Sequence, residues 1–370
     1  MNKKLLAVAV ASAIALPVAA HADTSNVTIS GYLNMSVSSL KGKSAPTATD
    51  NSSMTNVSSN ASNIVLAGKE DLGNGYAAIW QVQTFISFGG TGNTDTVNTD
   101  GLSNGTSYVG MATPFGALVA GKSDTPMKTL SRKVDLFNNE LGDSRGALDS
   151  YSNWDLRTNN AVAYISPNFG GLTVTAAYVT NCTSCGVPVG TDGFTAANSV
   201  NDLSAYSLNA LYSNGPIFAG VAYENHNFKG ASVGATSNPD AWRLAGGYDF
   251  GMFKVVALWQ RQSNIGGGTK SANTWGLGGS FNATPDNVLK AQYYRANDES
   301  GVSNSGGAVW ALGYDHLMSK RTTLYVNYAQ AQTHAATVGI TPFGGGFGDN
   351  PGIVEGQSAH GFGVGMIHTF

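Results

Sequence analysis

The feature that most constrains the fold of this chain is an alternation of apolar and polar residues with a period of two. Clear examples are the segments 27–37, 242–250 and 362–370. In the last of these, His368 and four apolar residues occupy the even positions, and glycine and threonine occupy most of the odd ones. A period of two places successive side chains on opposite faces of a β-strand. The pattern therefore predicts strands of about ten residues with one apolar face and one polar, small-residue face.

Tight turns and longer polar stretches separate these strands. Glycine, asparagine and proline, the usual turn residues, recur in seven motifs at residues 72–75, 113–116, 167–171, 213–216, 250–252, 283–286 and 318–321. Between them lie eight longer stretches rich in Gly, Ser and Asn, the first of which spans residues 41–60. These fifteen connections imply sixteen strands. Short turns on one side and long loops on the other are typical of outer-membrane barrels.

The physics of a membrane favours closure of this sheet. No apolar run after the N-terminus reaches the roughly 18 residues that a membrane helix needs, whereas strands of roughly 9–11 residues cross the hydrocarbon layer. An apolar outer face in lipid requires every backbone N–H and C=O to be paired, which a barrel without edges achieves. A secreted β-sandwich or solenoid fits the alternation but not the loop asymmetry. We predict an all-β fold, a closed 16-stranded antiparallel transmembrane β-barrel.

Residues 1–22 have the form of a secretory signal peptide. Lys3 and Lys4 precede an apolar run over residues 5–20, and Ala-His-Ala at 20–22 resembles a cleavage site. The mature chain, residues 23–370, is then a single barrel domain with 18 basic and 23 acidic residues, a formal net charge of −5. This balance gives no cationic surface for nucleic acid.

Six segments resemble the general-diffusion porins of Gram-negative outer membranes, in the proteobacterial branch of that family. They occur in order, at residues 27–33, 66–73, 114–126, 157–171, 317–325 and 364–370. The resemblance implies a water-filled barrel in the cell outer membrane, usually a homotrimer, through which small hydrophilic solutes and ions diffuse passively. It also implies contact with outer-membrane lipid and lipopolysaccharide. A passive channel needs no cofactor, and the sequence indicates none.

In that family the third loop folds into the lumen and narrows the channel. The matching loop here spans about residues 124–154. Its apolar residues Met127, Leu130, Val134 and Phe137 have helical spacing. A short helix on the inner wall would bury this stripe. In the alternative, the stripe holds an extracellular loop against the rim of the barrel.

Charges on this loop and on the facing wall are the candidate determinants of selectivity. Acidic groups on the loop opposite basic groups on the wall would create a transverse field that sorts solutes by charge. The predicted constriction residues are Arg157, Lys122 and Arg243 on the wall and Asp135, Glu140, Asp143 and Arg132 on the loop. Tyr32 and Asn63 stand where many relatives carry basic wall residues, so the basic cluster on the wall is smaller here. Together with the net charge of −5, this predicts weak selectivity for cations. Each charged wall residue has an alternative role in an ion pair away from the narrowing.

Motifs that suggest chemistry lack the setting that the chemistry needs. Cys182 and Cys185 form a CxxC motif in a Gly/Thr/Asn-rich loop, without the helix N-terminus of a redox site or the further ligands of a zinc site. In an exported protein we expect them to form a small loop disulfide. Gly230-Ala-Ser-Val-Gly234 matches a serine-hydrolase pattern but lies in a polar loop. We expect no catalytic residue and no metal site.

The C-terminus has a separate predicted role. An alternating last strand that ends in Phe370 resembles the signal that barrel-insertion machinery recognises in outer-membrane barrels. Besides a general porin, two functions remain open. One is a solute-specific channel with a saturable site, and the other is an adhesin or structural barrel plugged by its own loops. A barrel enzyme would need a histidine, an acid and a nucleophile at one rim, and the sequence specifies no such set.

Overall fold

The computed structural model of the chain describes residues 26–43, 51–86, 88, 101–182, 185, 203–227, 237–334 and 358–370. The predicted signal peptide, residues 1–22, and the serine-hydrolase pattern at 230–234 lie outside the described residues. The strands are β1 (Asn26–Lys43), β2 (Asn51–Ser59), β3 (Asn63–Gly73), β4 (Tyr76–Phe85), β5 (Ser107–Thr113), β6 (Gly116–Asp124), β7 (Arg157–Ile165), β8 (Leu172–Val179), β9 (Ser204–Asn214), β10 (Ile217–Asn227), β11 (Asp240–Asp249), β12 (Phe253–Ser263), β13 (Ser271–Thr284), β14 (Asn287–Ala296), β15 (Gly307–Leu317), β16 (Thr322–Thr333) and β17 (Ser358–Thr369). The helical segments are η1 (Gly101–Ser103), α1 (Pro126–Ser131), α2 (Arg145–Leu148) and η2 (Ile265–Gly267). None of the helices in these ranges is long and apolar enough to cross a membrane.

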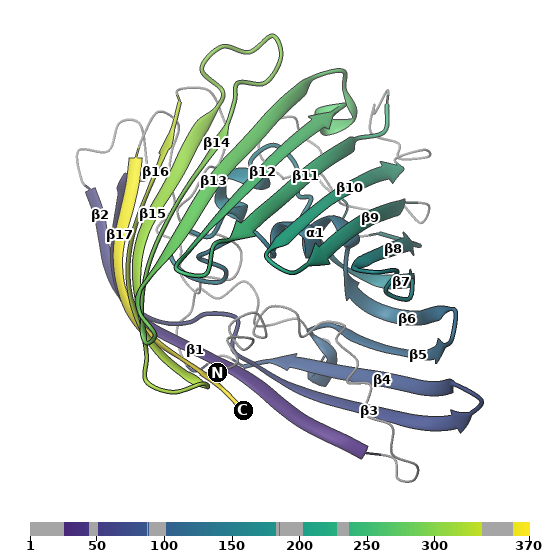
Figure 1. Cartoon of the computed structure of the whole chain (residues 1–370). Coiled ribbons are helices and arrows are strands. Elements are labelled where there is room, and N and C mark those ends of the chain that lie inside the picture. Colours follow the sequence, from purple (N-terminus) through teal and green to yellow (C-terminus); the bar gives the residue numbers. More distant parts are fainter. Residues whose placement is uncertain are drawn as a thin grey trace.

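All the described strands belong to one antiparallel sheet, in which consecutive strands from β3 to β17 pair with each other. β1 closes the sheet, because it pairs with β17 on one edge and with β2 and β3 on the other. Residues 35–43 of β1 pair with β2 and residues 26–32 with β3, so β2 and β3 act as one barrel strand interrupted at residues 60–62. The result is the predicted closed barrel of sixteen strands (Figure 1).

The sequence-based boundaries are wrong at the first long connection. The composition of residues 41–60 predicts a loop, but β1 extends to Lys43 and β2 occupies Asn51–Ser59. The Ser- and Asn-rich segment pairs residue by residue with β1, so tertiary context overrides its low strand propensity. The seven predicted tight turns all connect strands that the structure pairs.

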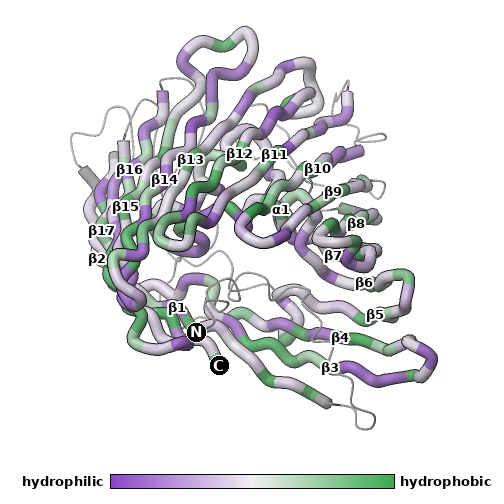
Figure 2. Tube along the Cα trace, in the orientation of Figure 1, coloured by the Kyte–Doolittle hydropathy of each residue, from purple (hydrophilic) through white to green (hydrophobic). Residues whose placement is uncertain are grey.

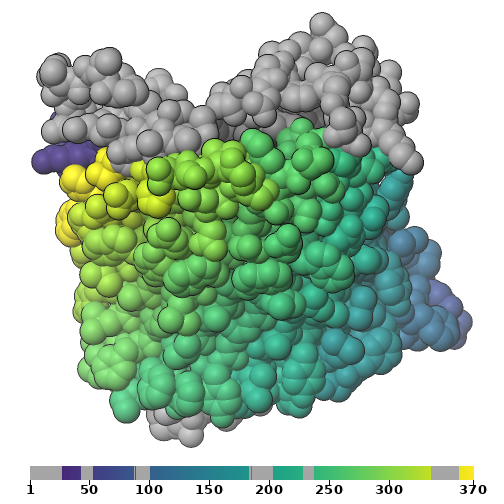
Figure 3. All heavy atoms as spheres, turned by 90° about the horizontal axis from the view of Figure 1, so that it is seen from above, coloured from purple at the N-terminus to yellow at the C-terminus, as the bar shows by residue number. Residues whose placement is uncertain are grey.

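The alternation of the sequence becomes an alternation between two faces of the wall. On β11, Trp242 and Leu244 are each 48% exposed, whereas Arg243 between them is 0% exposed. We call the face with the exposed apolar rows the outer face and the opposite face the inner face. Figure 2 shows hydrophobic and hydrophilic residues alternating along the strands, and Figure 3 shows successive strands forming one continuous wall.

Aromatic side chains line the outer face near the loop ends of one part of the barrel. Every strand from β8 to β16 presents one there: Tyr178, Tyr206, Tyr223, Trp242, Trp259, Trp275, Tyr293, Trp310 and Tyr328. Such girdles mark the membrane–water interface. The corresponding part of β1, β2, β5 and β6 carries Ser39, Thr55, Ser107 and Ala120.

Phe370 lies at the seam where the barrel closes. The backbone N–H of Gly31 donates a hydrogen bond to the carbonyl oxygen of Phe370 at 2.9 Å. The phenyl ring covers Gly31 so closely that a Cβ at that position would overlap it. The closing role of the last residue is therefore visible in the fold, and its recognition by insertion machinery stays a prediction.

Candidate functional site

The connection between β6 and β7, residues 125–156, packs against the inner face of the wall. Its helix α1 begins after Thr125, whose Oγ1 accepts a hydrogen bond from the backbone N–H of Lys128 at 3.4 Å. The helix contacts β9, β10 and β11, and Asn209 Nδ2 on β9 donates to the carbonyl oxygen of Pro126 at 2.8 Å. In Figure 1, α1 lies within the ring of strands.

The apolar stripe predicted for this loop is buried, although the helix is shorter than the stripe. Met127, Leu130, Val134 and Phe137 are all buried. α1 ends at Ser131, so Val134 and Phe137 lie in turns beyond it. Val134 packs in one cluster with small wall residues such as Ala222 and Ala245. The apolar groups thus attach the loop to the inner face along its length.

Arg132 is the centre of an ion-pair cluster inside the loop. Its guanidinium lies 3.1 Å from Asp135, 3.2 Å from Asp143 and 2.8 Å from Asp155. The three acidic side chains are 0% exposed and that of Arg132 is 10% exposed. Burial alone would lower the pKa of Arg132, but the three carboxylates raise it above its usual value.

The two acids Asp135 and Asp143, which share Arg132, differ in their other partners. Asp143 also accepts Arg145, whose Nη2 lies 2.6 Å from its Oδ2. Burial raises the pKa of Asp143, but Arg132 and Arg145 outweigh burial and hold it well below its usual range. Asp135 shares Arg132 with Asp143, and burial together with the neighbouring carboxylate raises its pKa. Gln292 Nε2 on β14 donates to Asp135 Oδ1 at 2.9 Å, which connects the cluster to the wall.

Arg243 fastens the same cluster to β11. Its Nη1 lies 2.5 Å from Asp155 Oδ1 and 2.9 Å from the carbonyl oxygen of Met127. Its Nε donates to Gln260 Oε1 at 2.9 Å, and Gln260 Nε2 in turn donates to the carbonyl oxygen of Leu148 at 2.9 Å. One buried guanidinium thus holds the start and the end of the loop at one place on the wall.

Glu140 forms a second anchor at the far end of the loop. Lys290 Nζ on β14 lies 2.9 Å from Glu140 Oε2 and 3.1 Å from Asp315 Oδ1 on β15. Asn327 Nδ2 on β16 also donates to Glu140 Oε2, at 3.1 Å. Burial raises the pKa of Glu140 to about 7, in spite of the opposing effect of Lys290.

A third group lies where the loop leaves the wall. Asp124 Oδ1 is 2.9 Å from Arg157 Nε and 3.1 Å from Lys128 Nζ. The Arg157 guanidinium lies 4.8 Å from the centre of the Phe85 ring. The side chains of Arg157 and Asp124 are each 21% exposed, so this group is more open than the Arg132 cluster. Burial lowers the pKa of Lys128, and the charges of Arg157 and Arg145 add to this against the opposing charge of Asp124.

Simple alternation along the strands does not show which face of the wall carries Arg157 and Lys122. In sequence, Arg157 is in step with Ala161, but β6 and β7 pair irregularly between them and Asn160 has a φ of 56°. Lys122 shares its row with Leu118, which is exposed on the outer face. We therefore leave Lys122 out of the constriction proposed below.

The structure brings four of the predicted residues into one connected network and separates the others. Asp135, Asp143 and Arg132 are in direct contact, and Arg243 joins them through Asp155. Glu140 and Arg157 belong to the two separate groups. Sequence reasoning missed Asp155 and the wall residues Gln260, Gln292 and Asn327. A signal for the three wall residues exists, since Gln260, Gln292 and Asn327 each adjoin an outward aromatic residue in an alternating strand.

The two cysteines have a structural setting. A disulfide joins Cys182 to Cys185, with Cα atoms 5.3 Å apart. Both residues pack with Leu156 and Val179 where β8 ends. Within the part of the chain that the structure describes, no three His, Cys, Asp or Glu side chains are grouped so that they could hold a metal ion.

The fold and this site together define a class of protein. A closed barrel with an apolar outer face and a charged segment on its inner face is a pore-forming protein of the outer membrane.

Comparison with known proteins narrows this class to a family. A family model described as Gram-negative porin matches residues 7–336. Outer membrane porin protein 32 of Delftia acidovorans is 29% identical over 384 residues, covering 100% of both chains. The major outer membrane protein P.IB of Neisseria gonorrhoeae is 28% identical over 83% of each chain. The structure of an anion-selective porin from Comamonas acidovorans aligns with a TM-score of 0.73 at 26% identity, over 94% of this chain and 100% of that one.

The chain belongs to the Gram-negative porin family. It is an outer-membrane porin, whose barrel forms a channel for the passive diffusion of small hydrophilic solutes and ions, as its sequence predicts. The family and the fold are those of channels and not of enzymes.

Proposed function

We propose that residues 124–154 form the inward-folded third loop of this porin and narrow its water-filled pore. The observation that carries the proposal is the double attachment of the loop to the inner face. Arg243 binds Asp155 and Lys290 binds Glu140, from two different strands of the wall. A segment held at both places occupies part of the cross-section at a fixed position, and solutes pass beside it.

The charge that solutes meet at this narrowing is positive in our proposal. The loop acids predicted to face the pore, Asp135 and Asp143, are sealed behind Arg132. The side chains that keep some exposure are Arg132 and Arg145 on the loop and, beside its start, the ion pair of Arg157 with Asp124, so that three of these four side chains are cationic. We therefore propose a preference for anions. The anion-selective porin from Comamonas acidovorans supports this direction.

This proposal opposes the cation preference that the net charge of −5 suggests. Salt screens exposed charges beyond about 8–10 Å at physiological ionic strength. Acidic residues outside the narrowing therefore have little influence on an ion inside it. The local arrangement of Arg157, Arg145 and Arg132 decides the sign.

The test is the reversal potential of the refolded porin in a planar bilayer under a salt gradient. We expect the sign of an anion preference, and we expect R157Q and R145Q each to move the potential toward zero. R321Q is the control, because Arg321 lies exposed in the short turn between β15 and β16. A potential of the cation sign, or one that these two variants leave unchanged, contradicts the proposal.

The same recording distinguishes the other functions. A current that saturates with one solute and is blocked by it would indicate a solute-specific channel. Silent membranes with a correctly folded barrel would indicate a plugged or adhesive barrel. For the general porin we expect conductance that rises with salt concentration, often in groups of three equal steps.

We also propose that the porin is a homotrimer whose subunits meet along β1 to β7. The observation behind this is the aromatic girdle, which covers the loop ends of β8 to β16 on the outer face but gives way to Ser39, Thr55, Ser107 and Ala120. A surface that faces another protein does not need interfacial aromatic residues. V57C and L277C compare the two regions, because Val57 is 56% exposed and Leu277 53% exposed on the outer face. A short bis-maleimide should link subunits through V57C and not through L277C; equal linking refutes this interface.

Two steps of export complete the proposal. The signal peptide, residues 1–22, is removed before insertion, and Phe370 presents the last strand to the barrel-insertion machinery. N-terminal sequencing of the mature protein should begin at Asp23. F370A should reduce the amount of folded porin in the outer membrane, and an unchanged amount would remove this role from Phe370.

A further inference from the structure

A glycine on the inner face of the last strand makes room for a tyrosine of the neighbouring strand. Tyr325 on β16 pairs in register with Gly365 on β17, which pairs in turn with Ser36 on β1. A Cβ at Gly365 would overlap the ring of Tyr325, so any side chain there would displace the phenol. The glycine therefore lets Tyr325, which is 2% exposed, extend across β17 toward β1.

The phenol of Tyr325 belongs to a chain of hydrogen bonds that crosses the seam of the barrel. Asn60 Nδ2 donates to the Tyr325 hydroxyl at 3.2 Å, and that hydroxyl donates to Asn34 Oδ1 at 2.8 Å. Asn34 Nδ2 donates to the Tyr32 hydroxyl at 3.0 Å and to the backbone carbonyl oxygen of Asn139 at 3.3 Å. Asn34 and Asn60 are both 0% exposed. The chain thus begins in the wall and ends in the loop.

The interruption between β2 and β3 supplies the first donor of this chain. Ala61 in the interruption has a φ of 54°, a value that is uncommon outside turns. On either side of it, the backbone N–H of Asn60 donates to the carbonyl oxygen of Asn34 at 2.8 Å, and Ser62 Oγ accepts the backbone N–H of Asn34 at 2.9 Å. The interruption therefore holds the backbone of Asn34 and places the amide of Asn60 beside Tyr325.

The order of donors fixes the direction of the Asn34 amide. Because Asn60 Nδ2 can only donate, the hydroxyl proton of Tyr325 goes to Asn34 Oδ1. The nitrogen end of the Asn34 amide is then the end that faces Asn139. A reversed amide would place its oxygen against the carbonyl oxygen of Asn139, and two acceptors form no hydrogen bond. One hydroxyl on β16 therefore decides whether Asn34 binds the loop.

Asn139 connects this chain to a cation of the proposed narrowing. Its φ of 59° places it in a tight turn of the loop. Its Oδ1 accepts Arg145 Nη2 at 2.8 Å, and its backbone N–H donates to Asp143 Oδ2 at 2.9 Å. The same Asp143 oxygen lies 2.6 Å from Arg145 Nη2. Asn139 thus links the wall to Arg145 and to the carboxylate that Arg145 binds.

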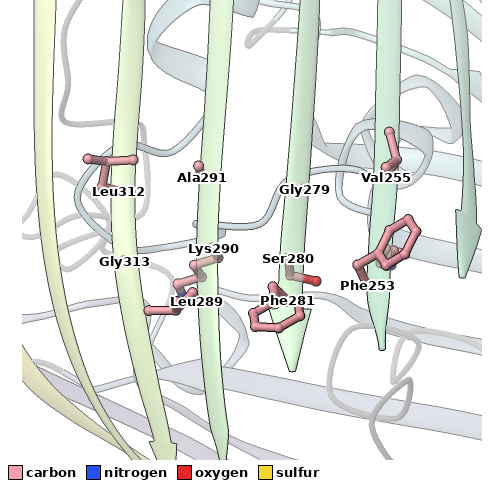
Figure 4. A pocket seen from close by; sticks show the side chains of 11 residues that line it. Phe253, Val255, Gly279, Ser280, Phe281, Leu289, Lys290, Ala291, Leu312 and Gly313 are labelled. Atoms are coloured by element: carbon pink, nitrogen blue, oxygen red, sulfur yellow. The ribbon is translucent and has the colours of Figure 1, made fainter. Parts of the chain in front are cut away.

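The residue after Asn139 is held in a comparable way. Glu140 binds Lys290 on β14, and a Cβ at Gly313 on β15 would lie 2.9 Å from Lys290 Cε. Figure 4 shows Lys290 and Gly313 on these neighbouring strands. At both places a glycine of the wall gives a long side chain of the adjacent strand the room to reach its partner.

We propose that Tyr325 and Asn34 are positioning residues that hold Arg145 at the narrowing through Asn139. This inference rests on the proposed function, in which Arg145 is one of the cations that give the anion preference. Gly365 and the interruption at residues 60–62 make the contact possible. Without the Tyr325 hydroxyl, the Asn34 amide loses its fixed direction, and Arg145 keeps Asp143 but loses a fixed Asn139.

The test uses Y325F in the refolded full chain, because this variant loses one hydroxyl and keeps the ring over Gly365. We expect hydrogen exchange of residues 138–146 to become about fivefold faster, the effect of one lost buried hydrogen bond. The reversal potential under a salt gradient should move toward zero, by less than in R145Q. Y328F is the control, because Tyr328 lies on the outer face of the same strand and stacks on His360. It should change neither measurement.

A double variant separates positioning of Arg145 from a general structural role. If Tyr325 acts through Arg145, Y325F/R145Q should have the reversal potential of R145Q alone. G365A, which displaces the phenol, should reproduce the reversal potential of Y325F. If G365A does not fold, Y325F decides the question.

Two results would overturn the proposal. One is unchanged exchange of residues 138–146 in Y325F. The other is a shift of the potential by Y325F that is as large in the R145Q background as in the wild type, because Tyr325 would then act elsewhere. If R145Q itself leaves the potential unchanged, the anion proposal fails, and the exchange rates still decide whether Tyr325 holds the loop. The two failures are thereby distinguishable.

Discussion

The inner faces of two parts of the barrel wall differ in their chemistry. From β5 to β8 the inner rows consist mainly of Gly, Ala, Val and Ile, such as Val119 and Ala163. From β11 to β16 they include Arg243, Gln260, Lys290, Gln292 and Asn327, and each of these binds the loop directly. The comparison shows that the loop lies where the wall offers hydrogen-bonding groups. In our proposal the pore lies beside the part of the wall that offers few such groups.

Removal of Arg243 should have the largest effect on the attachment of the loop to the part of the wall between β11 and β16. R243M leaves Asp155 buried with only Arg132 as its basic partner, and loss of one member of a buried ion pair costs about 3–5 kcal/mol. We expect the loop to detach, with larger and noisier single-channel conductance. V119T, a nearly isosteric change on the loop-free part of the wall, should conduct like the wild type. If R243M conducts normally, Arg243 is not the anchor.

Removal of Lys290 should have a smaller effect at the second anchor. K290M leaves Glu140 with Asn327, and because the pKa of Glu140 is already about 7, protonation offers it a low-cost neutral form. We expect the free energy of loop attachment to fall by about 2 kcal/mol. The measurement is the voltage at which the channel closes, which should be lower than in the wild type. The double variant K290M/E140Q should recover part of the loss. A double variant no better than K290M would show that the pair is not coupled.

The loop should be held less firmly as pH rises. Burial, and next the charge of Asp155, raise the pKa of Asp149 to about 7, well above its usual value. Between about pH 4 and 7, Asp149 is protonated in the attached loop but ionised in the detached loop. The equilibrium constant for attachment therefore falls by up to about tenfold for each unit by which the pH rises. Hydrogen exchange of residues 145–156, corrected for intrinsic rates, measures this slope. D149N should reduce this slope, and Glu140, whose pKa burial also raises to about 7, should account for the rest. An unchanged slope in D149N would show that Asp149 does not contribute.

The smallest effect on loop attachment is expected from substitution of Trp154, at the end of the loop. Trp154 Nε1 donates to Gln262 Oε1 at 2.9 Å, and its ring stacks on His226. W154F keeps an aromatic ring but loses the hydrogen bond, which is worth about 1 kcal/mol. Exchange of residues 145–156 should become a few times faster with unchanged conductance. W154A, which also removes the ring, should be clearly worse. Equal effects would show that the ring contributes nothing, and a W154F that exchanges like the wild type would exclude the hydrogen bond.

Much of the fold is predictable because its rules are local. The alternation on β11 predicts from three adjacent residues that Arg243 points inward between Trp242 and Leu244, and the structure agrees. The seven turn motifs and the eight polar stretches together likewise predict the number of strands. Prediction fails where alternation is interrupted, as at Asn160 before the register of β7 is regained.

The candidate site is only partly predictable, because its contacts join distant parts of the chain. The sequence identifies Asp135, Glu140 and Asp143 as charged loop residues but not their partners. Glu140 binds Lys290, 150 residues away, and Asp155 binds Arg243, 88 residues away. No local pattern of the sequence indicates such a pairing. The sequence-based prediction that these acids face the pore therefore could not take account of the cations that cover them.

By itself, the sequence determined a membrane-spanning barrel, its turns, and which residues of a regular strand face lipid. A period of two and the need to pair every backbone group in lipid leave no other closed fold. Only the tertiary structure decided which charges of the loop are buried in ion pairs and which stay partly exposed at the proposed narrowing. Net charge is a sum over the whole chain, whereas an ion in the pore responds to the few groups within a screening length of it, and packing of the loop on the wall selects those groups.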